Sequence, residues 1–351
     1  MAQGEGGSEL SGVPRSLAGR RPAPATDRLL ADLVPPRHFA TESFDTFRPD
    51  AAHPSQAAAL ARLRDVAAAM DRPAMPRFRR RRPAPRPAVY LDGGFGVGKT
   101  HLLASLARAV GTGRTAYGTF VEFTHLVGAL GFAATVDALA SRTLVCIDEF
   151  ELDDPGDTML MTRLVRELSD RGVGLAATSN TLPESLGQGR FAAEDFLREI
   201  QAMAARFEVL AIDGPDYRHR TAVTDRPGLA DDEVRDVVAG RADATLDDFG
   251  DLLAHLAHVH PSRYSALLAG VDLVGLTGVR PVRRQDVALR LVVLVDRLYD
   301  RDVPVLLGGA GERVLFGEDM LAGGYRKKYY RALSRLGALV EAGAVEAART
   351  G

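Results

Sequence analysis

From residue 88 onward, short apolar runs alternate with segments in which apolar residues recur at helical spacing. Such alternation is typical of β–α–β units, in which parallel strands form a sheet and the connecting helices cover its faces. The apolar runs predict strands at 88–92, 115–119, 143–148, 174–178 and 208–212. The helical patterns predict helices at about 101–110, 122–130, 157–170 and 193–205. The expected fold is therefore α/β, with a parallel sheet flanked by helices.

The residues before this pattern differ in character. Residues 1–26 are rich in Gly, Ser, Pro and Arg and lack apolar periodicity, so we expect a disordered tail. Helical spacing returns over 54–70 and predicts a helix there. Residues 71–87 contain five prolines and seven arginines, which indicate a long loop. Its run from Arg79 to Arg82 either binds an anionic partner or is a solvated part of the loop, and we expect a solvated loop.

A weak internal echo marks the C-terminal part. Residues 221–245 are charged and poor in large apolar residues, and they are interpreted as a connection. Beyond them, a strand near 273, a helix ending at 300 and a strand near 305 repeat the spacing of the strands and helix between 143 and 178. Gly278 and Val279 stand where the first copy has Asp148 and Glu149. The sequence thus predicts a core domain over 27–220 and a C-terminal α/β part over 221–351 that contains a degenerate β–α–β unit.

Composition limits the setting of this fold. The chain has 351 residues, 46% of them hydrophobic, and a formal net charge of −2, which is unlike that of a basic nucleic-acid-binding protein. The single cysteine, Cys146, lies in an apolar run, where we expect a core residue and a cytoplasmic location. We find no apolar run of about 18 residues and no signal-peptide pattern, so we expect no membrane span.

The strongest chemical motif follows the first predicted strand. Gly93-x-x-x-x-Gly98-Lys99-Thr100 is the P-loop pattern, in which backbone N–H groups wrap a phosphate chain and glycines leave room for it. We expect Lys99 to reach the β- and γ-phosphates of ATP and Thr100 to hold Mg²⁺. The predicted nucleotide-binding residues are Gly93, Gly94, Phe95, Gly96, Val97, Gly98, Lys99, Thr100 and His101.

A second motif matches the first. The apolar strand at 143–148 ends in Asp148, and a carboxylate at the carboxyl edge of a parallel sheet lies beside the metal of a P-loop site. Glu149 follows at once, where it can polarise the attacking water as a general base. The next strand ends at Asn180, which we interpret as a sensor of the γ-phosphate; the alternative is an ordinary turn or helix cap. The predicted catalytic set is Lys99, Glu149 and Asn180, with Thr100 and Asp148 on Mg²⁺.

These motifs belong to a longer ordered set that resembles the ZapE-type branch of the AFG-like ATPases, within the extended AAA+ class. The resemblance covers about residues 39–340. The set comprises Ser43-Phe-Asp-Thr-Phe-Arg-Pro, Pro54-Ser-Gln-Ala, the P-loop, Cys146-Ile-Asp-Glu-Phe, Ala177-Thr-Ser-Asn-Thr-Leu-Pro-Glu-Ser-Leu, Asp213-Gly-Pro-Asp-Tyr-Arg-His-Arg, Asp296-Arg-Leu-Tyr-Asp-Arg and Arg331-Ala-Leu-Ser-Arg-Leu.

The resemblance implies a partner that the residues themselves do not specify. It implies a cytoplasmic, Mg-dependent ATPase that acts in cell division on the FtsZ ring or another division protein, as a nucleotide-dependent homo-oligomer. The Arg- and Pro-rich stretch 71–87 and the pair Gly308-Gly309 depart from the family pattern. The alternative is a nucleic-acid-dependent ATPase of the DnaC or IstB type, for which DNA-stimulated turnover with a steep salt dependence is the discriminating observation.

Further residues have weaker claims. Arg206 resembles the arginine of DnaC and IstB that contacts a neighbour's ATP, where charge develops during transfer. Its rivals are Arg190 as a finger and Arg331 or Arg335 as sensors within one chain; each is alternatively a surface charge. Phe47 and Gln56 either contact adenine or serve packing and capping. The trio His255, His258 and His260 is spaced so that only two share a helical face, which favours a packed or solvated cluster over a metal site.

Overall fold

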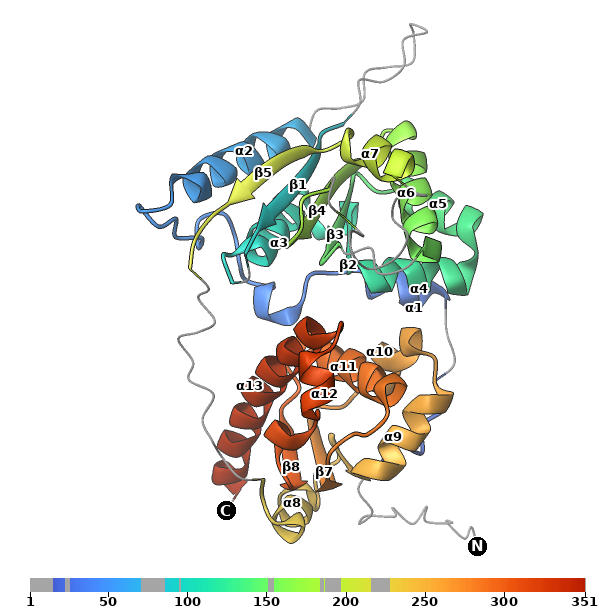
Figure 1. The fold of residues 1–351 in the computed structure, drawn as a ribbon, viewed down its shortest axis with the longest axis vertical. Helices are drawn as coiled ribbons and strands as arrows, with labels where there is room; N and C mark the ends of the chain where they lie inside the picture. The colour runs from blue at the N-terminus through green and yellow to red at the C-terminus, as the bar shows by residue number, and fades with distance from the viewer. Residues whose placement is uncertain are drawn as a thin grey trace, which may run out of the picture. The chain divides into compact units, whose positions relative to one another are not determined.

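The computed structural model describes residues 15–22, 26–70, 86–94, 96–150, 155–183, 186, 197–215 and 228–350. The chain divides into two compact units (Figure 1): Pro24–Arg220 forms one, and Met1–Ala23 together with Thr221–Gly351 forms the other. Phe95, Arg190 and the run from Arg79 to Arg82 lie outside the described residues. The expectations for these residues stay predictions.

The unit of residues 24–220 is built on a five-stranded parallel sheet in the order β2-β3-β4-β1-β5. Its strands are β1 (Ala88–Gly93), β2 (Thr115–Thr119), β3 (Leu144–Asp148), β4 (Gly174–Ser179) and β5 (Glu208–Ile212). Each begins and ends within one residue of its predicted bounds. The expected parallel sheet is confirmed.

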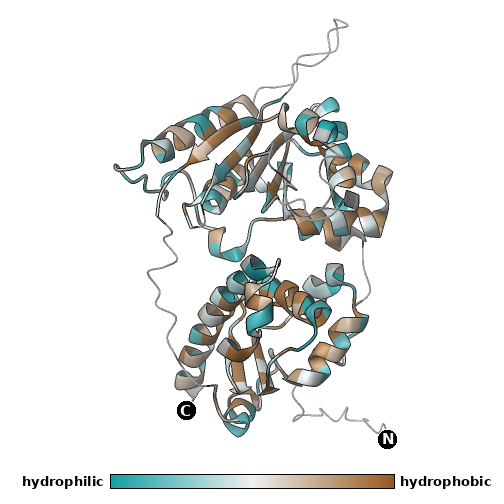
Figure 2. Ribbon diagram, viewed as in Figure 1, coloured by the Kyte–Doolittle hydropathy of each residue, from teal (hydrophilic) through white to brown (hydrophobic). Residues whose placement is uncertain are grey.

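Helices cover both faces of this sheet, because successive strand residues point to opposite sides. On one face, Leu144 and Cys146 pack with α2 (Pro54–Met70) and α3 (Lys99–Val110). On the other, Val145 and Ile147 pack in a cluster with residues of the remaining helices. Those are α4 (Phe120–Leu130), α5 (Phe132–Ala140), α6 (Pro155–Asp170) and α7 (Leu197–Ala204), preceded in the chain by α1 (Thr26–Ala31). In Figure 2 brown predominates in the strands and the helices carry both colours, as expected for a buried sheet between amphipathic helices.

The second unit contains a smaller parallel sheet in the order β6-β7-β8, with strands β6 (Ala244–Asp248), β7 (Leu273–Val279) and β8 (Val305–Gly309). The predicted second β–α–β unit is present as β7, α11 (Gln285–Asp300) and β8, and Gly278 and Val279 end β7. The other helices are α8 (Asp231–Val238), α9 (Phe249–His258), α10 (Tyr264–Leu267), α12 (Glu318–Ala322) and α13 (Arg326–Thr350). Short 3-10 helices in the two units are η1 (Arg37–Phe39), η2 (Thr112–Arg114), η6 (Pro261–Arg263) and η7 (Glu312–Val314).

The expectation of a disordered tail over 1–26 is wrong for residues 15–22, which we call the N-terminal strap. Arg15 forms a parallel bridge with Thr245 on β6, and the Leu17 side chain is fully buried in the core of the second unit. The Asp247 carboxylate accepts hydrogen bonds from the backbone N–H groups of Leu17 and Ala18, both at 2.9 Å. The strap is ordered because it covers a sheet edge and buries one leucine, which the polar composition around it conceals. Residues 1–14 lie outside the described part.

Among the described residues, no single helix is long and apolar enough to cross a bilayer, and only the sharply bent pair α4 and α5 meets the length and composition criteria together.

Candidate nucleotide-binding site

The predicted site residues gather at the carboxyl edge of three adjacent strands. The P-loop follows β1, Asp148 ends β3, and Asn180 follows β4, which lies between β1 and β3. In a parallel sheet the carboxyl ends of the strands share one edge, so motifs separated by more than 80 residues come together there. The strand order therefore explains why Asn180 lies between the phosphate loop and the acidic pair.

Backbone conformation shapes the P-loop itself. Gly96 and Gly98 have φ values of 69° and 95°, in the left-handed region that favours glycine. A Cβ on Gly93 would lie 2.2 Å from the Ile212 carbonyl oxygen, and one on Gly98 would lie 2.6 Å from the Phe47 ring, so neither position has room for a side chain. Helix α3 begins at Lys99, directly after this loop, and its first N–H groups and positive dipole end suit a phosphate.

The Lys99 ammonium group is held at the mouth of this loop. It donates hydrogen bonds to the carbonyl oxygens of Gly93 at 2.9 Å and Gly94 at 2.5 Å, and to Asn180 Oδ1 at 2.8 Å. Nearby, burial raises the pKa of the Asp92 carboxyl, and the Lys99 charge opposes that rise. The contacts join the P-loop lysine to the end of β4 and fix where its charge lies.

The oxygen groups beside Lys99 fit a hard divalent cation. Asp148 is 4% exposed, its Oδ1 lies 3.4 Å from Thr100 Oγ1, and its Oδ2 accepts a 2.8 Å hydrogen bond from the Tyr117 hydroxyl. Magnesium prefers carboxylate and hydroxyl oxygens together with phosphate oxygens and water, and the donors here are all oxygens. Thr100 and Asp148 are thus suited to hold Mg²⁺.

Glu149 leaves the sheet in an unusual conformation. Its φ is 52°, and among the described non-glycine residues only Glu149 and Asp302 have a positive φ. A side chain rarely adopts this region unless the surroundings enforce it, and such residues cluster at functional sites. The turn places Glu149 immediately beyond Asp148, at the same edge as the P-loop.

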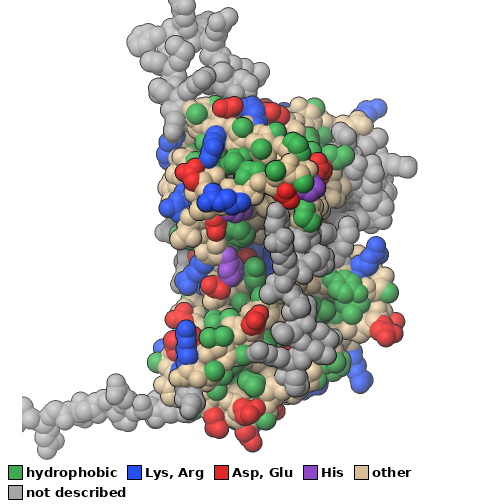
Figure 3. Space-filling view, turned by 90° about the vertical axis from the view of Figure 1, so that its left-hand side faces the viewer, with side chains coloured by type: hydrophobic (Ala, Val, Ile, Leu, Met, Phe, Trp, Pro, Cys, Tyr) green, Lys and Arg blue, Asp and Glu red, His purple; other side chains and the backbone are tan. Residues whose placement is uncertain are grey.

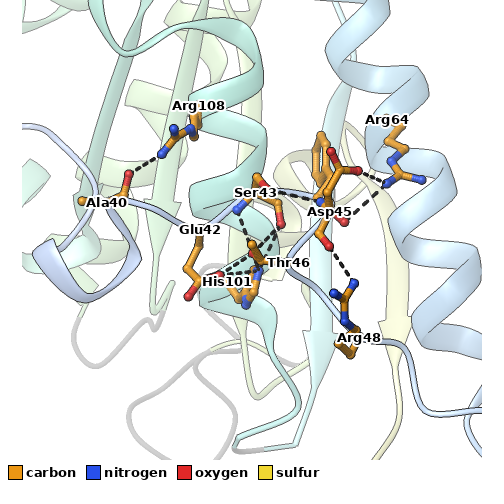
Figure 4. A network of polar contacts seen from close by, with 10 residues as sticks. Ala40, Glu42, Ser43, Asp45, Thr46, Arg48, Arg64, His101 and Arg108 are labelled. Atoms are coloured by element: carbon orange, nitrogen blue, oxygen red, sulfur yellow. Dashed lines mark hydrogen bonds and ion pairs between the residues drawn. The ribbon is translucent and has the colours of Figure 1, made fainter.

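The imidazole of His101 faces the segment that precedes α2, as Figure 4 shows. Its Nε2 lies 3.0 Å from Thr46 Oγ1, 3.2 Å from the Ser43 carbonyl oxygen and 3.3 Å from Glu42 Oε2. The side chain therefore anchors residues 42–46 to the first turn of α3. If His101 contacts a phosphate, it does so through its backbone N–H group, because its side chain bonds residues 42–46.

Phe47 and Gln56, the candidates for adenine contact, are largely committed to packing. The Phe47 ring lies edge-on to the His101 ring with centroids 5.3 Å apart. Gln56 is 1% exposed; it accepts a hydrogen bond from the Asp50 backbone N–H at 2.9 Å and donates one to the Asp213 carbonyl oxygen at 2.8 Å. The capping and packing interpretation accounts for Gln56.

Three of the arginine candidates belong to the described part of the chain. Arg206 comes just before β5, at the amino edge of the sheet, and contacts Asp170 at 3.1 Å and Ser169 at 3.2 Å. Arg331 and Arg335 belong to the second unit, where they bond Asp296 at 2.8 Å and 2.6 Å. Arg206 therefore lies at the opposite edge of the sheet from the P-loop of its own chain, which follows the carboxyl end of β1.

The three histidines of α9 and its flank do not form a metal site. His255 Nε2 lies 2.9 Å from the Arg20 carbonyl oxygen of the N-terminal strap. Within the described part of the chain, no group of three or more His, Cys, Asp or Glu side chains is arranged to hold a metal ion. The residues that sequence reasoning missed are Tyr117 and Thr178, whose hydroxyl groups both bond Asp148. Only the pairing of β3 with β2 and β4 brings them there, and the sequence gives no sign of it.

Comparison with known proteins identifies the family. The sequence model described as AFG1-like ATPase matches residues 24–231 and 225–347. The chain belongs to the AFG1-like ATPase family. The resemblance drawn from the ordered motifs is thereby confirmed, and its match extends through both units.

Individual relatives of this AFG1-like ATPase match only part of its sequence, at 29% to 32% identity. The cell division protein ZapE of Escherichia coli K12 is 32% identical over 144 residues, which are 38% of this chain and 38% of that protein. An uncharacterized protein of Schizosaccharomyces pombe is 29% identical over 154 residues, 39% of this chain and 34% of that one. The chain thus spans less than two fifths of the length of these curated relatives.

Solved structures resemble part of the fold. DnaI is 16% identical, with a TM-score of 0.41 over 54% of this chain and 98% of that one. Domain III of the Thermotoga maritima replication initiation protein DnaA is 19% identical, with a TM-score of 0.37 over 50% of this chain and 68% of that one. These similarities are too low to support a functional comparison.

Proposed function

We propose that this AFG1-like ATPase binds Mg-ATP through residues 93–101 and hydrolyses its β–γ phosphoanhydride bond. The observation that carries the proposal is the convergence, at one sheet edge, of the Lys99 ammonium group, the Asn180 carboxamide, the oxygens of Thr100 and Asp148, and Glu149. Phosphoryl transfer needs little covalent help from a protein; positioning and charge stabilisation suffice, and these groups supply both.

Each residue then has a defined task. The N–H groups of the P-loop bind the phosphate oxygens, and Lys99 places its charge beside the β- and γ-phosphates. Mg²⁺, held by Thr100 and Asp148, neutralises charge on the phosphate chain when it is bound. Glu149 accepts the proton of the attacking water, and Asn180 contacts the γ-phosphate and orients that water. Arg206 of a neighbouring copy adds positive charge as the phosphoryl group leaves.

Paired substitutions at Glu149 and Lys99 test the assignment. Glu149→Gln keeps the shape of the side chain but cannot accept a proton, so we expect Mg-ATP binding to persist and turnover to fall by about 10²–10⁴-fold. Lys99→Ala is expected to abolish nucleotide binding, measured by titration with a fluorescent ATP analogue. Glu167→Gln, on the partly exposed ion pair of α6 with Arg166, is the control and should change neither quantity. ATP affinity of Lys99→Ala equal to that of the wild type would contradict the proposal.

We further infer that hydrolysis remodels a protein partner in cell division, with FtsZ as the first candidate, in the cytoplasm. The named relative is a cell division protein. The net charge is −2, and on the face drawn in Figure 3 acidic and basic side chains are interspersed, which suits a protein partner better than a nucleic acid. ATP can drive such remodelling only through contacts that differ between nucleotide states.

Light scattering of FtsZ polymers tests the partner directly. We expect the wild-type protein with ATP to change the scattering trace and Lys99→Ala to leave it unchanged. Identical traces with ATP, with ADP and without nucleotide would exclude FtsZ as the partner. ATP turnover that rises on addition of DNA and falls steeply with salt would instead assign the chain to the DnaC and IstB functional class.

A further inference from the structure

The hydroxyl group of Thr178 lies between the two acidic residues of the candidate site. Thr178 is on β4, which pairs with β3, and is 1% exposed. Its Oγ1 donates a short hydrogen bond to Asp148 Oδ1 and accepts one from the Glu149 backbone N–H at 3.0 Å. A carboxylate only accepts and a backbone N–H only donates, so the direction of both bonds is fixed. One hydroxyl group therefore links the side chain of Asp148 to the backbone of Glu149.

The same residue holds the turn that carries Glu149. The Phe150 backbone N–H donates to the Thr178 carbonyl oxygen at 2.7 Å, so residues 149 and 150 are both bonded to Thr178. Between these bonds Glu149 adopts its φ of 52°. A left-handed glutamate persists only where its surroundings enforce it, and the bonds to Thr178 on both sides of Glu149 help to maintain this conformation.

The orientation of the Asp148 carboxylate depends on the same contact. Tyr117 on β2 fixes Oδ2 with a 2.8 Å hydrogen bond, and Thr178 on β4 fixes Oδ1 from the other side. Two strands thus hold the carboxylate plane between them. Oδ1 also lies 3.1 Å from the Glu149 backbone nitrogen and 3.4 Å from Thr100 Oγ1, so the Thr178 hydroxyl group adds a restraint from the β4 side.

We propose that Thr178 is a positioning residue that aligns Asp148 and Glu149 for ATP hydrolysis. The inference rests on the proposed function and adds a residue to it. Thr178 touches neither phosphate nor water in this role; it acts through the two acids. Asn180, which follows two residues later on the same strand end, takes the contact with Lys99 instead. Strand β4 therefore carries the residue for alignment, and the residue for sensing follows directly after the strand.

The test compares Thr178→Val with Thr178→Ser. Valine keeps the shape and loses the hydroxyl, whereas serine keeps the hydroxyl and loses the methyl group. We expect Thr178→Val to lower kcat by about 10- to 100-fold, the range for losing a hydrogen bond to a charged group, with little change in the KM for ATP. Thr178→Ser should retain most of the wild-type kcat. Thr162→Val is the control: it removes a buried threonine hydroxyl on α6 that bonds the Thr158 carbonyl oxygen at 2.8 Å.

A structural measurement accompanies the kinetics. Hydrogen exchange, followed by mass spectrometry on peptides spanning residues 147–150, should be faster in Thr178→Val than in the wild type and in Thr178→Ser, because the Glu149 amide loses one of the two acceptors that it shares between Thr178 and Asp148. Should Thr178→Val fail to fold, as judged by circular dichroism, Thr178→Ala replaces it in the same comparison.

The outcomes separate this inference from the proposed function. A wild-type protein without ATPase activity would overturn the proposed function itself. An active wild type together with an equally active Thr178→Val would overturn the role of Thr178 alone. Equal losses of kcat in Thr178→Val and Thr178→Ser would assign the effect to packing of the methyl group and would also overturn it.

Discussion

Lys99 and Asn180 meet although 81 residues separate them in the chain, and their contact at 2.8 Å joins the phosphate loop to β4. We expect Asn180→Ala to lower kcat by about 10-fold. Lys99 loses a hydrogen-bond partner that positions its ammonium group, and the attacking water loses a residue that orients it. Steady-state ATP hydrolysis gives kcat and KM. Ser179→Ala, which removes a hydroxyl group that accepts a hydrogen bond from the Thr181 N–H at 3.2 Å, is the control.

For single residues, the sequence predicts the motif residues of the site but not the residues that hold them in position. The P-loop, Asp148 and Glu149 are recognisable because their chemistry depends on spacing along one strand and one turn. Tyr117 and Thr178 escape recognition because their role depends on which strands pair, and tyrosine and threonine are ordinary strand residues. The imidazole of His101 is a similar case, since its partners lie more than 50 residues earlier in the chain.

In the second unit, a mostly buried cluster of ion pairs joins helices α11 and α13. Asp296 on α11 bonds Arg331 and Arg335 on α13, and all three side chains are about 15% exposed, at 16%, 16% and 15%. Burial alone would raise the pKa of Asp296, but the charges of Arg331 and Arg335 outweigh it and lower the pKa. A carboxyl whose folded-state pKa is lowered stabilises the fold above its unfolded pKa and loses this contribution as the pH falls through the folded value.

We therefore expect Asp296→Asn to lower the free energy of unfolding by about 3–5 kcal/mol at neutral pH, because two mostly buried guanidinium groups lose the negative charge of Asp296. The difference from the wild type should shrink in acid, where Asp296 is itself protonated. Urea unfolding at several pH values measures both effects. Asp286→Asn is the control, since its ion pair with Arg284 is 59% and 76% exposed and should contribute little. A loss that is equal at all pH values would contradict the ion-pair explanation.

Helices and strands were predictable where long apolar patterns define them. They were missed where only a few apolar residues need to be buried. The five strands of the first unit are continuous apolar runs, because a central parallel sheet is buried on both faces. Helix α8, in contrast, lies inside the stretch interpreted as a connection, since only Val234 and Val238 of its residues need to be buried. Helix α5 was missed as well; it starts directly after Gly131, where the pattern of α4 breaks off.

Over the whole molecule, activity is expected to depend on assembly. Arg206 lies at the sheet edge opposite its own P-loop, so its proposed role requires a second copy. Arg206→Ala should bind ATP normally and turn it over slowly, and mixing it with Lys99→Ala should partly restore activity, because one variant supplies the arginine and the other the intact pocket. Arg171→Ala, on a partly exposed pair with Asp137, is the control. Specific activity that is independent of protein concentration, with no complementation, would point to a monomeric enzyme.

The N-terminal strap contributes to the stability of the second unit. Leu17 is fully buried in that unit's core, so Leu17→Ala should lower its free energy of unfolding by about 2–5 kcal/mol, the range for truncating a buried leucine. ATP affinity should stay unchanged, because the P-loop lies in the other unit. Urea unfolding and nucleotide titration measure the two quantities. Val345→Ala, at a side chain that is 51% exposed, is the control.

The strap also sets an order of events during synthesis of the chain. Leu17 and the carboxylate of Asp247 that binds its backbone are 230 residues apart. At about 5–20 residues per second, a ribosome needs roughly 10–50 seconds to bridge that separation. All of residues 24–220 emerges within this interval, so the nucleotide-binding unit can fold while Leu17 still awaits its core. The strap is thus made before the nucleotide-binding unit but reaches its place after it, and for that time the apolar side chain of Leu17 stays open to chaperones and proteases.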